Sequence, residues 1–404
     1  MSNIQKHIPL PSDDLETETV TLNLGPTHPA THGIFQNVIE MDGERILSGV
    51  STIGYIHRAF EKIAEHRAFY QITPLTDRMN YCSSPINNMG WHTTVEKLLG
   101  IKTPKRVDYL RIIIMELARI ADHVVCTSVL AVDAGALTGF LYVMQQREKI
   151  YEIWQEICGS RLTTNIGRIG GFERNWPDIS FQKLEIFLDG FPKAFAEFEK
   201  LLTNNRIFMD RTRNVGPVTP EFAMQYGFTG PNLRATGIDY DVRVANPYSS
   251  YEDFDFEIPV GTKGDTYDRF RVRNEEVWQS VNIIKQALQK MPDTNEFTAD
   301  VPDYVLPPKE EVYNNMEALI YQFKIIMGEV PVPVGEVYHS VEGGNGELGF
   351  YLISDGGRKP YRLHFRRPCF IYYQAYTEMV KGCLLSDAIV ILSSMNVIAG
   401  ELDA

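Results

Sequence analysis

Two histidines, His28 and His32, are candidates for acid–base or ligand chemistry because they lie in a short segment with the sequence GPTHPATHG (residues 25–33). Proline fixes φ, removes a backbone donor and favours extended geometry in the residue before it, so the segment is expected to be a shaped loop and not a helix. The imidazoles could bind a metal ion, bond to the loop backbone or donate to a ligand carbonyl. A metal ion is the least favoured, since no carboxylate or thiolate stands beside them.

Two further segments contain groups that can do chemistry. Residues 76–82 (TDRMNYC) carry charges, a thiol and the phenol of Tyr81 just before an expected helix, and their types alone favour an ordinary N-cap by Thr76 or Asp77. Asp133 lies among small apolar residues, where a carboxylate must be paired or neutral because an unpaired buried charge is very costly. A histidine is its natural partner, and a helix cap or a structural hydrogen bond is the alternative.

Composition narrows the class of protein. A chain of 404 residues with 44% hydrophobic and 23% charged residues is typical of a globular protein, and a formal net charge of −13 argues against a nucleic-acid-binding face. Five cysteines without a C-x-x-C pair indicate a reducing compartment and no thiolate set for zinc or an iron–sulfur cluster. The dinucleotide-binding, P-loop and H-E-x-x-H motifs are absent from the sequence.

The elements that must position these groups are expected to be mainly helical. Apolar residues recur every three or four positions from residue 107 to 124, which predicts a long helix with one buried stripe. The apolar stretch 124–144 contains Asp133 and several small residues, so we interpret it as buried helix and not as a membrane span. Further helices are expected at about 61–70, 84–99, 137–158 and 179–202, after residue 273, and as two closing helices after Pro368.

Strands are expected near both ends of the chain. Short β-branched runs at 19–24, 34–40 and 45–50 predict strands, and alternating apolar residues after Gly335 predict a three-stranded meander. Residues 204–273 are rich in Gly, Pro, Asn and Tyr and are expected to wrap over the helical core. The chain is thus predicted to be α+β and mainly α, with an acidic N-terminal arm (1–19) and a single large domain (20–404). The arm resembles neither a signal peptide nor a transit peptide.

Taken together, the motifs closely resemble those of the 49-kDa subunit of respiratory complex I, which is the bacterial D-type subunit of NADH–quinone oxidoreductase. The matching segments are GPTHPATHG, IGYIHRAFEKIAEHR (53–67), TDRMNY (76–81), VDAGALT (132–138), RIGGF (168–172), TPEFAMQYGFTGPNLRATG (219–237), GDTYDRFRVRNEE (264–276) and GELDA (400–404). This resemblance implies a helical core of the nickel–iron hydrogenase large-subunit type. At the four positions where those hydrogenases bind their metal through cysteine, this sequence has Asn80, Ser83, Ile398 and Glu401. A metal centre is therefore not expected.

The resemblance implies a quinone headgroup site where the hydrogenase metal would lie. His32 and Tyr81 match the headgroup contacts, Asp133 matches the partner of that histidine, and His28 is assigned to cofactor binding. Reducing a quinone to a quinol adds two electrons and two protons, so donors must reach both carbonyl oxygens. Because imidazole and phenol can both donate a proton, these residue types suit the chemistry. Separation of the Asp133–His32 pair would link the reaction to proton translocation.

The resemblance also places a 4Fe–4S cluster in a partner protein of the complex, beside Arg58 and Arg78. A guanidinium at that position would raise the potential of the cluster. Thr163 stands where the family commonly has a histidine, so we expect a lower, pH-independent cluster potential suited to a menaquinone-type acceptor. A second departure, Asn396-Val397 in place of Asp-Pro, is interpreted as local.

The expected function is that of a peripheral-arm component of a proton-translocating NADH–quinone oxidoreductase, inactive alone, at the cytoplasmic side of a bacterial inner membrane. The substrate would be menaquinone or ubiquinone. The expected partners are a cluster-bearing B-type subunit, a C-type 30-kDa subunit, an I-type ferredoxin-like subunit and the H-type membrane subunit, with no nucleic acid. Two alternatives stay open: the equivalent component of an F420H2- or ferredoxin-linked quinone or phenazine reductase, and a non-catalytic docking scaffold.

Overall fold

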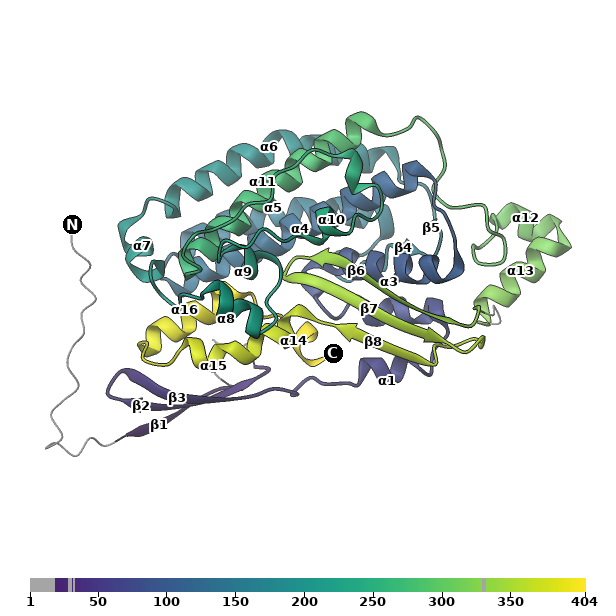
Figure 1. The fold of residues 1–404 in the computed structure, drawn as a ribbon. Coiled ribbons are helices and arrows are strands. Elements are labelled where there is room, and N and C mark those ends of the chain that lie inside the picture. Colours follow the sequence, from purple (N-terminus) through teal and green to yellow (C-terminus); the bar gives the residue numbers. More distant parts are fainter. Residues whose placement is uncertain (1–18, 28–30, 32, 329–331) are drawn as a thin grey trace, which may run out of the picture.

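The computed structural model describes residues 19–27, 31, 33–328 and 332–404 (Figure 1). Its main layer consists of four long helices: α4 (Lys105–Asp133), α5 (Leu137–Cys158), α6 (Asp178–Leu202) and α11 (Thr266–Lys290). α4 packs against both α11 and α5, and α5 packs against α6. Most of α4 is buried, which confirms the long helix predicted from the apolar spacing. The apolar stretch 124–144 is shared between α4 and α5, and Gly135 turns the chain between them at φ 97°.

Two three-stranded antiparallel sheets lie beside the helices. The N-terminal sheet has the order β1 (Val20–Leu24), β2 (Gln36–Asp42), β3 (Arg45–Thr52), with Val38 opposite Val50. The C-terminal sheet has the order β6 (Gly335–Gly343), β7 (Gly346–Ser354), β8 (Arg362–Arg366). These confirm the strands and the meander predicted from the sequence. A short antiparallel pair, β4 (Gly167–Arg168) and β5 (Gly171–Phe172), was not expected.

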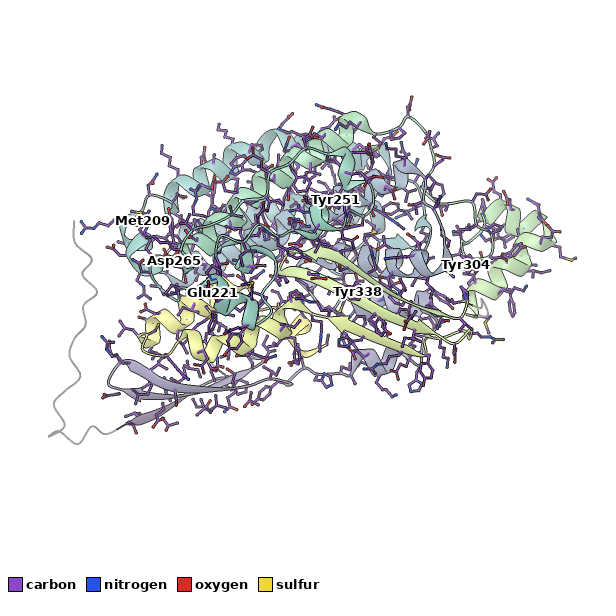
Figure 2. All side chains as sticks on the ribbon, in the orientation of Figure 1. Met209, Glu221, Tyr251, Asp265, Tyr304 and Tyr338 are labelled. Atoms are coloured by element: carbon purple, nitrogen blue, oxygen red, sulfur yellow. The ribbon has the colours of Figure 1, made fainter. Side chains whose placement is uncertain are left out.

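Two hydrophobic cores hold these elements together. In the larger core, α3 (Ser84–Leu99) packs on β6 and β7, and Phe350 contacts Trp91. In the smaller core, Ile39 and Ile46 of the N-terminal sheet pack with Ile391 near the C-terminus. Figure 2 shows the side chains that fill these layers, with Tyr338 on β6 and Asp265 at the start of α11. The N-terminal sheet therefore packs against residues near the C-terminus. None of the described helices has the length and apolar composition needed to cross a membrane.

The structure corrects three of these expectations. The helix expected at 61–70 is interrupted, because Ala68 adopts an extended backbone between α1 (Phe60–Ala64) and η2 (Phe69–Ile72). α11 begins at Thr266 and not after residue 273, because Asp265 caps it by accepting from the Asp268 N–H at 2.9 Å. The closing region is divided at Gly382 and Asn396, whose φ angles are 76° and 56°.

The remaining elements are short. They are α2 (Thr73–Thr76), η3 (Tyr81–Ser83), α7 (Arg206–Thr212), α8 (Pro220–Gln225), α9 (Gly230–Arg234), α10 (Val242–Ala245), η4 (Tyr251–Asp253), α12 (Lys309–Asn314), α13 (Met316–Ile326), α14 (Pro368–Tyr372), η5 (Tyr373–Ala375), α15 (Tyr376–Met379), α16 (Leu385–Met395) and α17 (Ala399–Asp403). The segment from 204 to 265 contains only short helices, as its composition predicts, whereas residues 266–273 form the start of α11. The boundary between an arm and a single domain at residue 20 stays a prediction, and residues 1–18 of that arm lie outside the described part of the chain.

Candidate functional site

A cavity of about 350 Å³ lies between η3, the C-terminal half of α4, the start of α5 and α16. Its wall is largely apolar, and Phe140 and Met144 of α5 form part of it. Six residues place polar or thiol side chains in the wall: Tyr81, Cys82, Cys126, Arg147, Ser393 and Asn396. A mostly apolar cavity with a few polar groups is the usual form of a small-molecule site.

Tyr81 reaches this cavity from the first residue of η3. The preceding residue, Asn80, adopts an extended backbone, and its side chain accepts a hydrogen bond from the Cys82 N–H at 3.1 Å, which begins the 3₁₀ turn. Burial raises the pKa of the Tyr81 phenol to about 12. The phenol therefore keeps its proton at neutral pH and can donate it to an acceptor in the cavity.

Asp133, the last residue of α4, is connected to the same cavity through Ser393. The Ser393 hydroxyl donates a hydrogen bond to the Asp133 carboxylate, and Ser393 itself lines the cavity. His28 and His32 lie outside the described residues, so the pairing of Asp133 with His32 stays a prediction. Ile34, two residues after His32, lines the cavity.

The two N-terminal positions that match hydrogenase metal ligands surround a buried carboxylate. Asp122 of α4 accepts hydrogen bonds from Asn80 Nδ2 at 2.7 Å, Ser83 Oγ at 3.0 Å and Asn396 Nδ2 at 3.0 Å. Gly344 passes so close that a Cβ at that position would lie 2.1 Å from Asp122 Oδ2. Neutral amide and hydroxyl donors therefore occupy this region.

Glu401, one of the two matched positions near the C-terminus, continues the same polar cluster. Glu401 accepts from the Cys369 N–H at 2.9 Å and from Asn345 Nδ2 at 3.2 Å, and Asn396 Nδ2 donates to Asn345 Oδ1 at 2.5 Å. Burial raises the pKa of the Glu401 carboxyl. Within the described ranges, no group of three or more His, Cys, Asp or Glu side chains is arranged to hold a metal ion.

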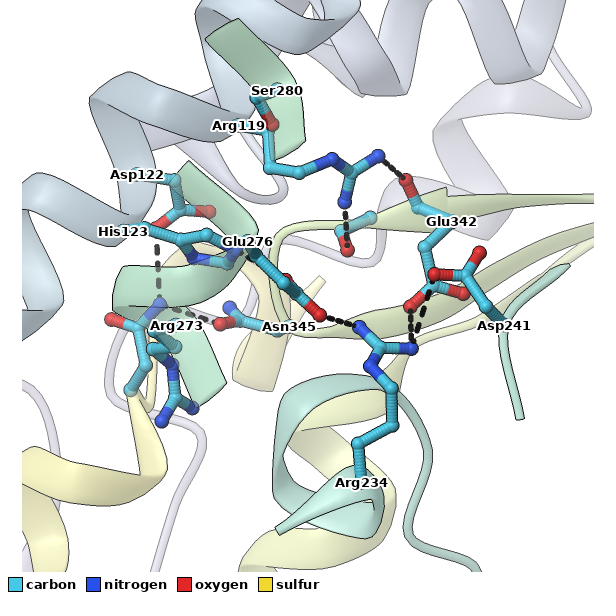
Figure 3. Close-up of polar contacts among 12 residues, drawn as sticks. Arg119, Asp122, His123, Arg234, Asp241, Arg273, Glu276, Ser280, Glu342 and Asn345 are labelled. Carbon is cyan, nitrogen blue, oxygen red and sulfur yellow. Dashed lines mark hydrogen bonds and ion pairs between the residues drawn. The ribbon is translucent and has the colours of Figure 1, made fainter. Parts of the chain in front are cut away.

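A buried ionic network lies next to this cluster (Figure 3). Arg234 of α9 contacts Glu276 of α11, Glu342 of β6 at 2.9 Å and Asp241 at 3.4 Å. His123 Nε2, next to Asp122 on α4, lies 2.6 Å from Glu276 Oε2. Burial lowers the pKa of His123, although Glu276 opposes the shift. Burial alone would raise the pKa of Glu276, but Arg234 and His123 lower it, so this carboxylate stays ionised and joins three elements.

Arg58, Arg78 and Thr163, which the family resemblance places near a partner's 4Fe–4S cluster, do not line the cavity. Arg78 is exposed, and its Nη1 donates to the Pro74 carbonyl at 2.7 Å. Thr163 is half-buried, and its carbonyl accepts from Ser160 Oγ at 2.9 Å. Arg58 is exposed in the segment after β3. Arg78 lies only three residues before Tyr81, whereas no contact among the described residues connects Arg58 to the cavity.

Comparison with known proteins decides the family. The family described as respiratory-chain NADH dehydrogenase, 49 Kd subunit, matches residues 133–404 of this chain. The chain belongs to this family. It is 75% identical over 388 residues to the D-type subunit of the NADH-quinone oxidoreductase of Flavobacterium johnsoniae, covering 96% of this chain and 94% of that protein. It is 69% identical over 386 residues to the second D-type subunit of Cytophaga hutchinsonii, covering 95% and 98%.

The match to a more distant relative covers only part of that protein. The NADH-quinone oxidoreductase protein of Bdellovibrio bacteriovorus that is named as a combined C/D-type subunit is 46% identical over 393 residues, which cover 97% of this chain and 70% of that protein. These matches confirm the family resemblance expected from the motifs, together with the mainly α fold.

Sequence reasoning missed several cavity residues. The sequence patterns do not point to Arg147 or Ser393, and they do not indicate Cys126 or Asn396 as cavity residues, although all four line the cavity. One signal was available: Phe140, Met144 and Arg147 are spaced by four and three residues, so an arginine falls on the apolar face of α5. Ser393 carries no such signal, because its partner Asp133 lies 260 residues away in the sequence.

Proposed function

We propose that this chain is a component of an NADH–quinone oxidoreductase and that the cavity beside Tyr81 binds the quinone headgroup. The observation that carries the proposal is the cavity of about 350 Å³ with the Tyr81 phenol in its wall. Its volume lies within the range of roughly 300–1,000 Å³ that is usual for small-molecule sites. An apolar wall suits the ring, and a few polar groups suit the two carbonyl oxygens.

The proposed reaction adds two electrons and two protons to the quinone. A 4Fe–4S cluster held by a B-type partner would supply the electrons one at a time, and Arg58, Arg78 and Thr163 are assigned to the face toward it. The Tyr81 phenol donates a proton to one carbonyl oxygen, since burial holds its pKa at about 12 and keeps it protonated. His32 is assigned to the other oxygen, Asp133 to its support and His28 to headgroup binding.

The proposed setting is the peripheral arm of complex I, on the cytoplasmic side of a bacterial inner membrane. The combined C/D name of the Bdellovibrio relative supports a C-type partner. A B-type subunit, an I-type ferredoxin-like subunit and the H-type membrane subunit complete the proposed neighbours. Menaquinone or ubiquinone is the proposed substrate, and separation of the Asp133–His32 pair is the proposed link to proton translocation.

Substitution of Tyr81 in the assembled complex tests the catalytic role. We expect Tyr81→Phe to lower quinone reductase activity by about 10²-fold, the lower range for loss of a positioned proton donor. The matched control is Tyr376→Phe, which removes a buried phenol that donates to the Ala388 carbonyl at 3.2 Å outside the cavity. Activity is measured with a short-chain quinone and normalised to the amount of assembled complex. Unchanged activity in Tyr81→Phe would instead support the docking scaffold.

The electron donor is tested separately. An F420H2- or ferredoxin-linked reductase could contain an equivalent component, because the donor module lies on other chains. We expect the purified complex to oxidise NADH and to contain an NADH-binding module. Isolation of a complex without that module, driven by reduced ferredoxin or F420H2, would favour the alternative.

A further inference from the structure

We propose that Arg147 is a further catalytic residue of the quinone site, where its guanidinium binds a headgroup oxygen and stabilises the negative charge that develops there during reduction. The inference rests on the proposed function. Its first support is position: Arg147 lines the cavity from α5, on the same face as Phe140 and Met144.

The second support is that the charge of Arg147 is not neutralised within the described structure. None of the ion pairs formed by the described residues includes Arg147, and its buried Nε has no hydrogen-bond partner. Other arginines, such as the buried Arg111 and Arg243, contact carboxylates directly. A cation in an apolar wall without a carboxylate beside it favours an oxygen acceptor that carries negative charge.

Packing against an aromatic ring does not by itself account for Arg147. The guanidinium carbon lies 4.8 Å from the centre of the Tyr151 ring. Arg161 lies 5.6 Å from the centre of the same ring, but it is exposed and pairs with Glu148. Two arginines thus flank one ring, and only Arg147 lines the cavity. The chain therefore offers a matched control that differs in access to the quinone.

Arg147 also acts on the two polar groups of η3 that line the cavity. Burial raises the pKa of the Cys82 thiol to about 12 and that of the Tyr81 phenol to about 12, and Arg147 opposes both shifts. The guanidinium is therefore close enough to both groups to act on an oxygen bound in the same cavity.

The reaction is balanced without any proton transfer to or from Arg147. Two electrons would arrive one at a time from a 4Fe–4S cluster held by a partner, and the two carbonyl oxygens would take protons from Tyr81 and from the proposed donor His32. Arg147 keeps its proton, since a guanidinium does not deprotonate in proteins. Its contribution is electrostatic, and it is larger than in water because the cavity wall has a low dielectric.

The test uses the assembled complex with Arg147→Gln, Arg147→Lys, Arg147→Ala and Arg161→Gln. We expect Arg147→Gln to lower kcat for a short-chain quinone by about 10²–10³-fold, as for loss of one preorganised oxyanion donor, with a smaller change in KM. Arg147→Lys should recover part of kcat, and added guanidinium ion at a non-denaturing concentration should raise kcat of Arg147→Ala. Arg161→Gln should resemble the unmodified complex. NADH oxidation by an acceptor that bypasses the quinone site reports assembly.

Three results would overturn the inference. In the first, Arg147→Gln has the same kcat as Arg161→Gln, while Tyr81→Phe is impaired. This result would reject the role of Arg147 but still support the proposed quinone site. The second is a change in KM alone, since this indicates uniform binding and no catalytic role. The third is loss of activity without recovery by lysine or guanidinium, which indicates a structural role. Full activity in both the Tyr81 and Arg147 variants would remove the proposed function itself.

Discussion

At the scale of single residues, the buried carboxyl group of Asp77 makes stability depend on pH. Its Oδ1 accepts a hydrogen bond from Asn88 Nδ2 at 2.5 Å, and burial raises its pKa from 3.8 to about 7. The unfolded chain therefore loses this proton at a lower pH than the folded chain. The stability that depends on this proton is fully present below pH 3.8 and is lost as pH rises to about 7.

The substitution Asp77→Asn should remove this dependence. The amide oxygen can still accept from Asn88, but the side chain cannot ionise. Each pH unit between the two pKa values corresponds to about 1.4 kcal/mol, so the variant should gain up to about 4 kcal/mol at pH 8 and little at pH 4. Urea unfolding of the purified chain at both pH values measures this. Asp355→Asn, in an exposed turn, is the control, and an equal gain at both pH values would contradict the prediction.

The site residues differ in how far the sequence could predict them. Residue types alone do not single out Tyr81, but the family resemblance implies it as a site residue, and it does line the cavity from η3, where Asn80 caps the turn. Ser393 and Asp133 meet only after α16 has packed beside the end of α4, and no local pattern encodes that contact. His28 and His32 lie outside the described residues, so their roles stay predictions.

At the scale of elements, the contact between α3 and the C-terminal sheet depends on Gly90. A Cβ at this position would lie 2.7 Å from Phe350 and 2.9 Å from Val341. Gly90→Ala should therefore destabilise the chain by about 1–3 kcal/mol, as overpacking of a core usually does. Gly190→Ala, on the exposed face of α6 where a Cβ meets only Lys149 at 4.0 Å, should instead stabilise it by about 0.5–1 kcal/mol.

The opposite signs of these two glycine substitutions separate packing from helix propensity. Chemical unfolding of both variants under one condition gives the comparison. If Gly90→Ala also raised the free energy of unfolding, α3 would not approach β7 as closely as the structure shows. Unchanged secondary structure by circular dichroism confirms that the variants are folded.

Elements were predictable where one pattern persisted over several turns. The spacing of apolar residues located α3 and α5 at their observed bounds, and alternation located the meander of β6 to β8. The short helices between 204 and 265 leave no clear pattern in the sequence. For example, α10 has only four residues, and its start depends on Asp241 accepting from the Arg243 N–H at 2.8 Å. Such caps decide the geometry of one or two residues and leave no periodic signal.

At the scale of the whole molecule, the C-terminal residues hold a segment near the other end of the chain. Asp403 is buried, and its carboxylate accepts from the Gly54 N–H at 2.9 Å and the Ile56 N–H at 3.0 Å. His57 Nδ1 lies 2.6 Å from the Asp403 carbonyl, and Arg367 donates to the Ala404 carbonyl. This contact fixes the backbone that leads to Arg58, which is assigned to the cluster face.

Removal of the Asp403 carboxylate should release this segment while the rest of the fold persists. A hydrogen bond to a charged group contributes about 1.5–3 kcal/mol, and 1.4 kcal/mol is a factor of ten, so Asp403→Ala should speed amide exchange of Gly54 and Ile56 at least about tenfold. Asp268→Ala is a matched control, because that carboxylate also accepts two backbone N–H groups, from Thr262 and Lys263. Hydrogen exchange of both variants should show faster exchange at 262–263 in one and at 54–56 in the other. If Asp403→Ala left the 54–56 amides as protected as before, the Asp403 carboxylate would not be what holds this segment. The backbone that leads to Arg58 would then be held by other contacts.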